Sequence, residues 1–246
     1  MKRVSDVEEL LDGPLDDPAA LRGNLRDLAR ANRWLGGTSL SARAIGALAG
    51  DRGAMTILDI GTGAADIPLA LLARAARDGR HLQVTGIDSR PEVLSAAVVR
   101  QPRLGMTPGL ELHVGDGRSL PFADRSFDIA HASLLLHHLD PTASVALLRE
   151  MSRVARRGIV VNDLVRGRLA WIGAWLLSHL ATGNRYTRRD APLSVRRAYT
   201  VAELTSLIAA AGLRVESSMV GGPIGHRVAL AATVAPVDGP AAGAAA

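Results

Sequence analysis

The chain has 246 residues, of which 48% are hydrophobic, and its formal net charge is +5. This length suits one α/β domain, and the hydrophobic fraction argues against global disorder. The absence of cysteine excludes disulfides, thiolate metal sites and cysteine nucleophiles, and it fits a cytoplasmic location. The basic residues are almost all arginine and, apart from a cluster at 185–197, are scattered rather than gathered into a patch interleaved with aromatic residues, so we expect no nucleic-acid partner.

The sequence predicts neither a signal peptide nor an integral membrane segment. No apolar stretch follows the charged residues at the start of the chain. The longest apolar run, 169–180, is shorter than the roughly 20 residues that a membrane-spanning helix needs.

Residues 1–50 carry helical signals and no strand pattern. Asp16, Asp17 and Pro18 mark a helix start, because an acidic cap followed by proline is typical of that position. A second short helix is expected over 39–48. We therefore predict an N-terminal helical segment, 1–50, that packs against the main domain, 51–235.

Strands and helices alternate from residue 55 onward. Strands are predicted at 55–60, 82–88, 110–114, 127–132 and 158–163, and helices between them at 66–78, 91–100 and 141–156. This alternation indicates an α/β fold with a mainly parallel sheet. Such sheets bind ligands at the carboxyl ends of strands, where the strand order reverses.

Residues 164–199 interrupt this rhythm, and we predict that they form an insertion covering the ligand cleft. An apolar helix at 169–180 carries Trp171 and Trp175 on one face. It could cover the sheet, line an acceptor pocket, form a homodimer contact or touch a membrane surface. The arginine-rich stretch at 185–197 reads as a solvated loop, with steering of an acidic substrate or closure of a lid as alternatives.

The last part of the domain begins with a capping box. Thr200 and Glu203 have the spacing of such a box, which predicts a helix to about residue 211. Two strands follow at 213–220 and 226–234. The tail, 236–246, is rich in Ala, Gly and Pro and is expected to be disordered.

The most informative motif is the glycine turn after the first predicted strand, Asp59-Ile60-Gly61-Thr62-Gly63. Glycine lets the backbone approach a nucleotide-like ligand closely. Asp66 stands where a dinucleotide-binding fingerprint has its third glycine. Together with Asp59 it would repel a pyrophosphate, so the turn suits an adenosyl ligand with a cationic centre and no phosphates.

Two further strand ends carry carboxylates. Asp88 could accept hydrogen bonds from both ribose hydroxyls, or it could cap the next helix, although Ser89 before Pro91 is the better cap candidate. Asp116, between Gly115 and Gly117, could accept from an adenine amino group, or it could be a simple turn residue.

The glycine turn, Asp88, Gly115-Asp116 and the stretch from Leu120-Pro121-Phe122 to Phe127-Asp128 together resemble class I S-adenosylmethionine-dependent methyltransferases of the ubiquinone/menaquinone and small-molecule type. The chain departs from the family pattern at Ala65, where a third glycine is usual. The resemblance implies a Rossmann-like sheet of seven strands, mostly parallel with the last antiparallel, and helices on both faces. It also implies S-adenosylmethionine as cofactor, held by Asp59, Gly61, Thr62, Gly63, Asp66, Asp88, Ser89, Gly115, Asp116, Gly117, Ala132 and Ser133.

By the same resemblance, the segment after the fourth strand faces the methyl acceptor. His137 or His138 could act as a general base, since histidine titrates near neutral pH, or either could be structural. Asp163, at the mouth of the cleft, could orient or deprotonate an acceptor, or it could be a helix cap or form an ion pair with Arg166 or Arg168. We expect no metal, because adjacent side chains on a helix diverge and no acidic triad lies nearby in the sequence.

The predicted function is methyl transfer to oxygen or carbon of a small, hydrophobic or aromatic, polyketide-like acceptor, of the kind found in secondary metabolism. Alternatives are a non-catalytic cofactor-binding module, a nucleic-acid methyltransferase, and an NAD(P)-dependent oxidoreductase. The residues after the fourth strand lack an Asn-Pro-Pro-Tyr-like motif for a flipped base, and the chain lacks the Tyr-x-x-x-Lys pair of many oxidoreductases.

Overall fold

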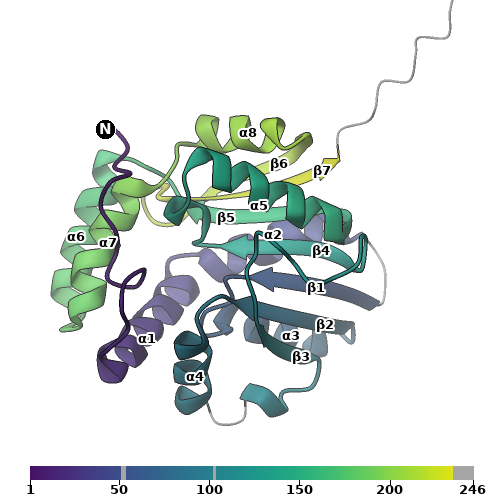
Figure 1. Cartoon of the computed structure of the whole chain (residues 1–246), viewed down its shortest axis with the longest axis horizontal. Helices are drawn as coiled ribbons and strands as arrows, with labels where there is room; N and C mark the ends of the chain where they lie inside the picture. The colour runs from purple at the N-terminus through teal and green to yellow at the C-terminus, as the bar shows by residue number, and fades with distance from the viewer. Residues whose placement is uncertain (51–53, 102–103, 235–246) are drawn as a thin grey trace, which may run out of the picture.

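The computed structural model describes residues 1–50, 54–101 and 104–234. A seven-stranded sheet forms the centre of the molecule (Figure 1). Its strands are β1 (Ala54–Ile60), β2 (His81–Asp88), β3 (Leu110–Val114), β4 (Phe127–Ser133), β5 (Ala155–Leu164), β6 (Leu213–Gly221) and β7 (Arg227–Val234). The order across the sheet is β3-β2-β1-β4-β5-β7-β6, and β7 runs antiparallel to both of its neighbours. The predicted mostly parallel sheet with an antiparallel last strand is confirmed.

Helices cover both faces of the sheet, as predicted (Figure 1). One face carries α1 (Pro18–Trp34), α2 (Gly37–Ala49), α3 (Asp66–Arg77) and α4 (Pro91–Arg100), and the other carries α5 (Pro141–Val154) and α8 (Val201–Ala210). The insertion after β5 forms α6 (Arg168–Ala181) and α7 (Arg185–Arg197), which pack against each other beside α1. Two short 3₁₀ helices span Leu104–Met106 and Leu136–His138.

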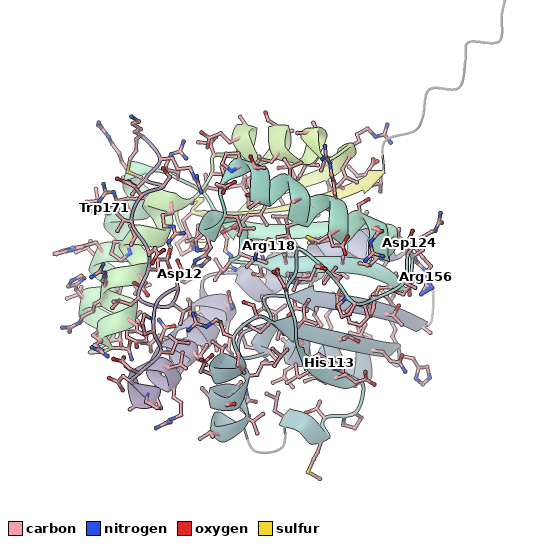
Figure 2. All side chains as sticks on the ribbon, viewed as in Figure 1. Asp12, His113, Arg118, Asp124, Arg156 and Trp171 are labelled. Atoms are coloured by element: carbon pink, nitrogen blue, oxygen red, sulfur yellow. The ribbon has the colours of Figure 1, made fainter. Side chains whose placement is uncertain are left out.

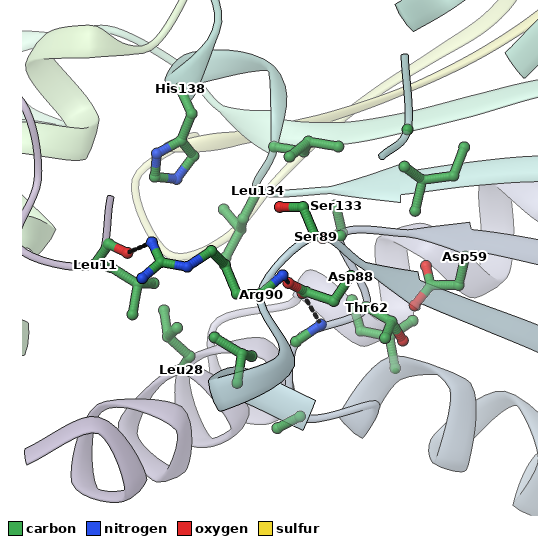
Figure 3. Close-up of a pocket in the computed structure, with 18 of the residues that line it drawn as sticks. Leu11, Leu28, Asp59, Thr62, Asp88, Ser89, Arg90, Ser133, Leu134 and His138 are labelled. Atoms are coloured by element: carbon green, nitrogen blue, oxygen red, sulfur yellow. Dashed lines mark hydrogen bonds between the residues drawn. The ribbon is translucent and has the colours of Figure 1, made fainter. Parts of the chain in front are cut away.

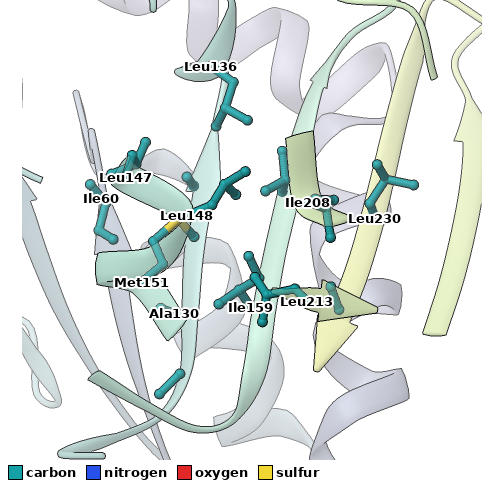
Figure 4. Close-up of a cluster of buried hydrophobic side chains, with 14 of the residues drawn as sticks. Ile60, Ala130, Leu136, Leu147, Leu148, Met151, Ile159, Ile208, Leu213 and Leu230 are labelled. Carbon is teal, nitrogen blue, oxygen red and sulfur yellow. The ribbon is translucent and has the colours of Figure 1, made fainter. Parts of the chain in front are cut away.

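Alternation along the central strands divides the core between the two faces. Ile57 packs with the α1–α4 side, whereas Leu58 packs with α5 and α8, because successive strand residues point to opposite faces. The buried cluster on the α5 and α8 side includes Leu148 and Met151 of α5 and Ile208 of α8 (Figure 4). Both faces are thus closed by apolar packing, and the carboxyl ends of the parallel strands remain available for a site.

The predicted capping box opens α8: Thr200 Oγ1 accepts from the Glu203 amide, and Glu203 Oε2 accepts from the Thr200 amide. By contrast, the expectation of a loop at 185–197 is wrong. That stretch is α7, capped by the side chain of Asn184 and continuous through Pro192. Four of its buried residues recur at helical spacing (Tyr186, Asp190, Leu193 and Arg197), a pattern that the arginines obscure in the sequence.

Ala65, which stands where the family has a third glycine, adopts left-handed backbone with φ of 55° and is fully buried. This conformation costs a non-glycine residue about 1–2 kcal/mol. We expect Ala65→Gly to raise the free energy of unfolding by about 0.5–1 kcal/mol, after the greater freedom of glycine in the unfolded chain is subtracted. Chemical denaturation measures the change.

Ala64→Gly is the matched control, because Ala64 is also buried but is not among the residues with positive φ. It loses the same methyl group without relief of strain and should destabilise the protein. If both variants destabilise it equally, the conformation of Ala65 carries no strain.

Candidate active site

A cavity of about 730 Å³ lies at the carboxyl ends of β1–β4, beside the point where the strand order reverses between β1 and β4 (Figure 3). One wall comes from the strand ends and includes Asp59, Gly61, Thr62, Gly63, Asp66, Asp88, Ser89, Gly115, Asp116, Gly117 and Ser133. The opposite wall comes from the N-terminal part of the chain and includes Glu8, Leu11, Asp12, Leu25, Leu28 and Asn32. The structure therefore gathers eleven of the twelve predicted cofactor residues around one space; Ala132 is buried within β4 instead.

The glycine turn presents bare backbone to this cavity. Gly61 and Gly63 both have positive φ, at 68° and 55°. A Cβ atom on Gly63 would meet nothing within 4 Å, while one on Gly61 would lie 3.2 Å from Leu135 Cδ1. The Thr62 amide donates to Ile87 O of β2 at 2.9 Å, which ties the turn to the neighbouring strand.

Asp88 joins the turn to the start of α4 (Figure 3). Its Oδ2 accepts from the Gly63 amide and its Oδ1 from the Arg90 amide, each at 3.0 Å. Burial raises the pKa of this carboxyl group. Because Arg90 is the N-cap of α4 and makes no side-chain cap, the expectation that Ser89 caps this helix is wrong.

The other carboxylates of the cavity wall have partners within the protein. Asp59 Oδ1 lies 2.5 Å from His131 Nδ1, and His131 Nε2 lies 2.7 Å from Ser41 Oγ, all of them buried. Asp66 Oδ2 accepts from Asn32 Nδ2 at 2.9 Å. Asp116 pairs with Arg118 at 2.8 Å, and these hydrogen bonds lower the pKa of Asp116.

A buried arginine supports the same wall, and the sequence analysis did not identify it. Arg227 donates to Ser133 Oγ at 2.9 Å, to Asn32 Oδ1 at 2.8 Å and to Asn162 Oδ1 at 2.9 Å. Burial lowers its pKa to about 10, so the guanidinium stays charged at neutral pH. No local motif marks a lone arginine at a strand start as buried; only the tertiary fold brings its partners together.

Among the three candidate catalytic residues, His138 is the one that lines the cavity, and Figure 3 shows its ring above Arg90 and Leu11. His138 Nδ1 lies 2.8 Å from Asp12 Oδ1, in an ion-pair contact without the alignment of a hydrogen bond. Although burial opposes the shift, His138 and Arg197 hold the pKa of Asp12 well below its usual range. Asp12 is therefore a fixed negative charge beside the imidazole.

Neither His137 nor Asp163 lines the cavity, so the expectation that Asp163 sits at the mouth of the cleft is wrong. Both residues are buried, and Asp163 Oδ1 lies 2.6 Å from His137 Nδ1. Burial opposes the shift, but the contacts with His137 lower the pKa of Asp163. This pair fixes the start of the 3₁₀ turn that carries His138.

Glu9 connects the two histidines from the N-terminal segment. Its Oε1 lies 3.8 Å from His137 Nε2 and its Oε2 lies 4.0 Å from His138 Nε2. Burial raises its pKa to about 7. The histidine rings lie 4.2 Å apart between centroids, so the expectation that they diverge is wrong. In the described part of the chain these three residues form the one cluster with metal-ligand spacing, their ligand atoms lying within 4.8 Å of one another.

The N-terminal segment, residues 1–17, covers the cavity in place of the insertion after β5. Arg90 donates to the carbonyl oxygens of Leu11, Asp12 and Gly13, and Asp190 accepts from the amides of Leu10 and Leu11. None of the lining residues of the described cavity belongs to 164–199, so the prediction that the insertion covers the cleft is wrong. The sequence before Asp16 carries no periodic signal that would have revealed this role.

The strand order and the cavity at the carboxyl ends of the parallel strands are those of the class I S-adenosylmethionine-dependent methyltransferase fold. Residues 57–158 match the family described as "Methyltransferase domain".

Known proteins of the same class resemble this chain in sequence and structure. The ubiquinone/menaquinone biosynthesis C-methyltransferase UbiE of Desulfotalea psychrophila is 35% identical over 138 residues, which are 56% of this chain and 49% of that protein. The chain thus spans about half the length of this relative. A SAM-dependent methyltransferase from Aquifex aeolicus superposes with a TM-score of 0.62 at 20% identity, over 89% of this chain and 99% of the other. The O-methyltransferase NcsB1 from neocarzinostatin biosynthesis, solved with S-adenosyl-L-homocysteine and 1,4-dihydroxy-2-naphthoic acid, superposes with a TM-score of 0.63 at 22% identity, over 93% and 62%.

Proposed function

We propose that this protein binds S-adenosylmethionine and transfers its methyl group to a hydroxyl oxygen, or an activated ring carbon, of a small apolar aromatic acceptor. The observation that carries the proposal is a single cavity with two chemically different ends. The glycine turn and Asp88 form one end, and His138 with Asp12 forms the other. The cysteine-free chain suits the reducing cytoplasm, where we place this activity.

The residues at the first end fit the cofactor. Asp88 accepts one backbone hydrogen bond on each oxygen, which leaves lone pairs for two ribose hydroxyls. Open space above Gly63 admits a ligand against bare backbone. The lining carries two guanidinium groups, of Arg90 and Arg118, against six carboxyl groups, so its balance of charge favours a cationic ligand over one with phosphates.

When bound, S-adenosylmethionine supplies an electrophilic methyl group on a positively charged sulfur. The residues of this chain would then position the acceptor, exclude water and remove a proton. His138 is the proposed base: it lines the cavity, and its Nδ1 lies 2.8 Å from the carboxylate of Asp12. His137, held by Asp163, positions the turn that carries His138.

The acceptor class follows from the apolar side chains between the two ends of the cavity. They come from the N-terminal segment, α1 and the loop after β4: Leu11, Leu25, Leu28, Leu134, Leu135 and Leu139. Such a lining favours a flat, weakly polar molecule with one ionisable hydroxyl. Two relatives agree with this class, because one is a C-methyltransferase of ubiquinone/menaquinone biosynthesis and another was solved with 1,4-dihydroxy-2-naphthoic acid.

Titration calorimetry with S-adenosylmethionine and S-adenosylhomocysteine, followed by a methyl-transfer assay on hydroxynaphthoates and hydroquinones, tests this proposal. We expect binding of both cofactor forms and turnover of at least one such acceptor. Binding without turnover of any acceptor would favour a non-catalytic cofactor-binding module. Tight binding of a dinucleotide, or methylation of nucleic acid alone, would contradict the proposal.

Glu9 predicts a specific pH dependence. Its pKa of about 7 means that it ionises near neutral pH, and its ionisation places a negative charge 3.8 Å from His137 Nε2 and 4.0 Å from His138 Nε2. We expect kcat/KM to rise through pH 7, and Glu9→Gln to remove that inflection while leaving cofactor affinity unchanged. An unaltered inflection in the variant would assign the titration to another group.

Dialysis against a chelator should leave the methyl-transfer activity intact. Loss of activity on dialysis and its recovery on adding zinc would instead make Glu9, His137 and His138 metal ligands.

A further inference from the structure

The outer surface of α6 is apolar and unused by the methyl-transfer site. Seven large hydrophobic residues of this helix are exposed: Leu169, Trp171, Ile172, Trp175, Leu176, Leu177 and Leu180. Leu180 is 83% exposed and Leu169 is 70% exposed. None of them lines the cavity, and Figure 2 shows Trp171 on the side of the molecule away from Asp124 and Arg156. Contiguous apolar surfaces of this kind mark interaction sites.

The helix is attached to the molecule along one narrow stripe. Ala170 and Ser178 are its buried residues, and α7 is its principal neighbour. At about 100° per residue, the exposed apolar side chains occupy roughly two-thirds of the circumference. α6 has 14 residues, and no helix in the described ranges is long and apolar enough to cross a bilayer. A surface contact that buries this helix lengthwise is therefore the arrangement that removes most of its apolar area from water.

The charges at the edges of this face have one sign. No Asp or Glu occurs from residue 164 to residue 189. Arg168 is exposed at the first turn of α6, and Arg188 lies at the other end, where it donates to the carbonyl oxygens of His179 and Thr182. Pairing two copies of this face would bring these arginines together, whereas a negatively charged surface would neutralise them.

We propose that α6 lies flat on an anionic lipid bilayer, with its leucines and isoleucine among the acyl chains and the arginines at its ends on lipid phosphates. Trp171 and Trp175 stand four residues apart and belong at the interface, where the indole ring is both apolar and hydrogen-bonding. In this orientation the bilayer contacts α6, which does not line the cavity. The inference is independent of the proposed acceptor.

Vesicle co-sedimentation of the full chain tests the proposal, with phosphatidylcholine vesicles containing phosphatidylglycerol compared with pure phosphatidylcholine. We expect binding to the mixed vesicles to be roughly tenfold or more stronger, and to weaken as salt is raised. In a Trp34→Phe variant the remaining tryptophans are Trp171 and Trp175. Their emission should shift to shorter wavelength on binding, and lipids brominated in the acyl chain should quench it.

Leu176→Glu combined with Leu180→Glu should abolish binding, and Arg168→Glu should remove the preference for anionic lipid. Met106→Glu is the matched control, because Met106 is 80% exposed in the 3₁₀ turn of Leu104–Met106 and should leave binding unchanged. Absence of binding to any vesicle would overturn the proposal. So would a concentration-dependent dimer that the two glutamates dissociate, since that result would assign the face to a second copy of the chain.

Discussion

Replacing Asp88 by alanine is expected to weaken binding of S-adenosylmethionine at least about 100-fold. A hydrogen bond to a charged group contributes about 1.5–3 kcal/mol, and the carboxylate can make two with the ribose hydroxyls. The variant also removes the acceptor of the Gly63 amide, so the glycine turn loses the contact that holds it against β2. Titration calorimetry gives the affinity, and circular dichroism with a thermal melt verifies that the variant is folded.

Asp116→Ala is the matched control for this measurement. Asp116 also follows a strand and lines the cavity, but it is largely exposed and paired with Arg118. We expect its loss to weaken binding less than about tenfold, because a solvent-exposed group contributes little net energy. Equal effects of the two substitutions would mean that Asp88 holds no special position toward the ligand.

His138→Ala is expected to lower kcat by about 10²–10⁴-fold, the usual contribution of a positioned base, with cofactor affinity preserved. The imidazole lines the cavity beside Leu134, Leu135 and Leu139, and its Nδ1 lies 2.8 Å from Asp12 Oδ1. Asp12→Asn should give a smaller loss, because it removes the charge but keeps the side chain in place. Initial rates at saturating cofactor and acceptor measure both effects.

His113→Ala serves as the control, since His113 is an exposed histidine on β3 outside the cavity. It should leave kcat unchanged. His137→Ala is less informative, because it would leave the buried carboxylate of Asp163 without its imidazole partner and destabilise the fold. A His138→Ala enzyme with full kcat would contradict the proposed role of this residue as the base.

The strand-end half of the site could be predicted because its signals are local. Gly61 and Gly63 follow a buried strand directly, and Asp88 and Asp116 end or follow the next two strands, so parallel pairing brings them to one edge. The capping box at Thr200 is a short-range pattern of the same kind. Residues close in sequence carry enough information for such elements, because their geometry depends on few partners.

The acceptor half could not be predicted, because its residues meet only in the folded chain. Glu9 and Asp12 reach His138 across more than a hundred positions, and they precede the first helix in a segment without periodicity. Arg197 pairs with Asp12 from a stretch whose many arginines resemble a solvated loop. The contacts among Glu9, Asp12, His138 and Arg197 depend on the packing of α7 beside α1. No pattern within α7 or within the N-terminal segment specifies that packing.

The contacts of the first thirteen residues have a consequence for biosynthesis. Arg3 donates to Arg197 O and the Val4 amide to Arg196 O, separations that span most of the chain. Arg3 and Val4 can make these contacts only after residues 196 and 197 have been synthesised, and loop closure over this distance carries an entropic penalty. The N-terminal wall of the cavity can therefore close only after β1–β5 and the insertion that follows β5 have left the ribosome.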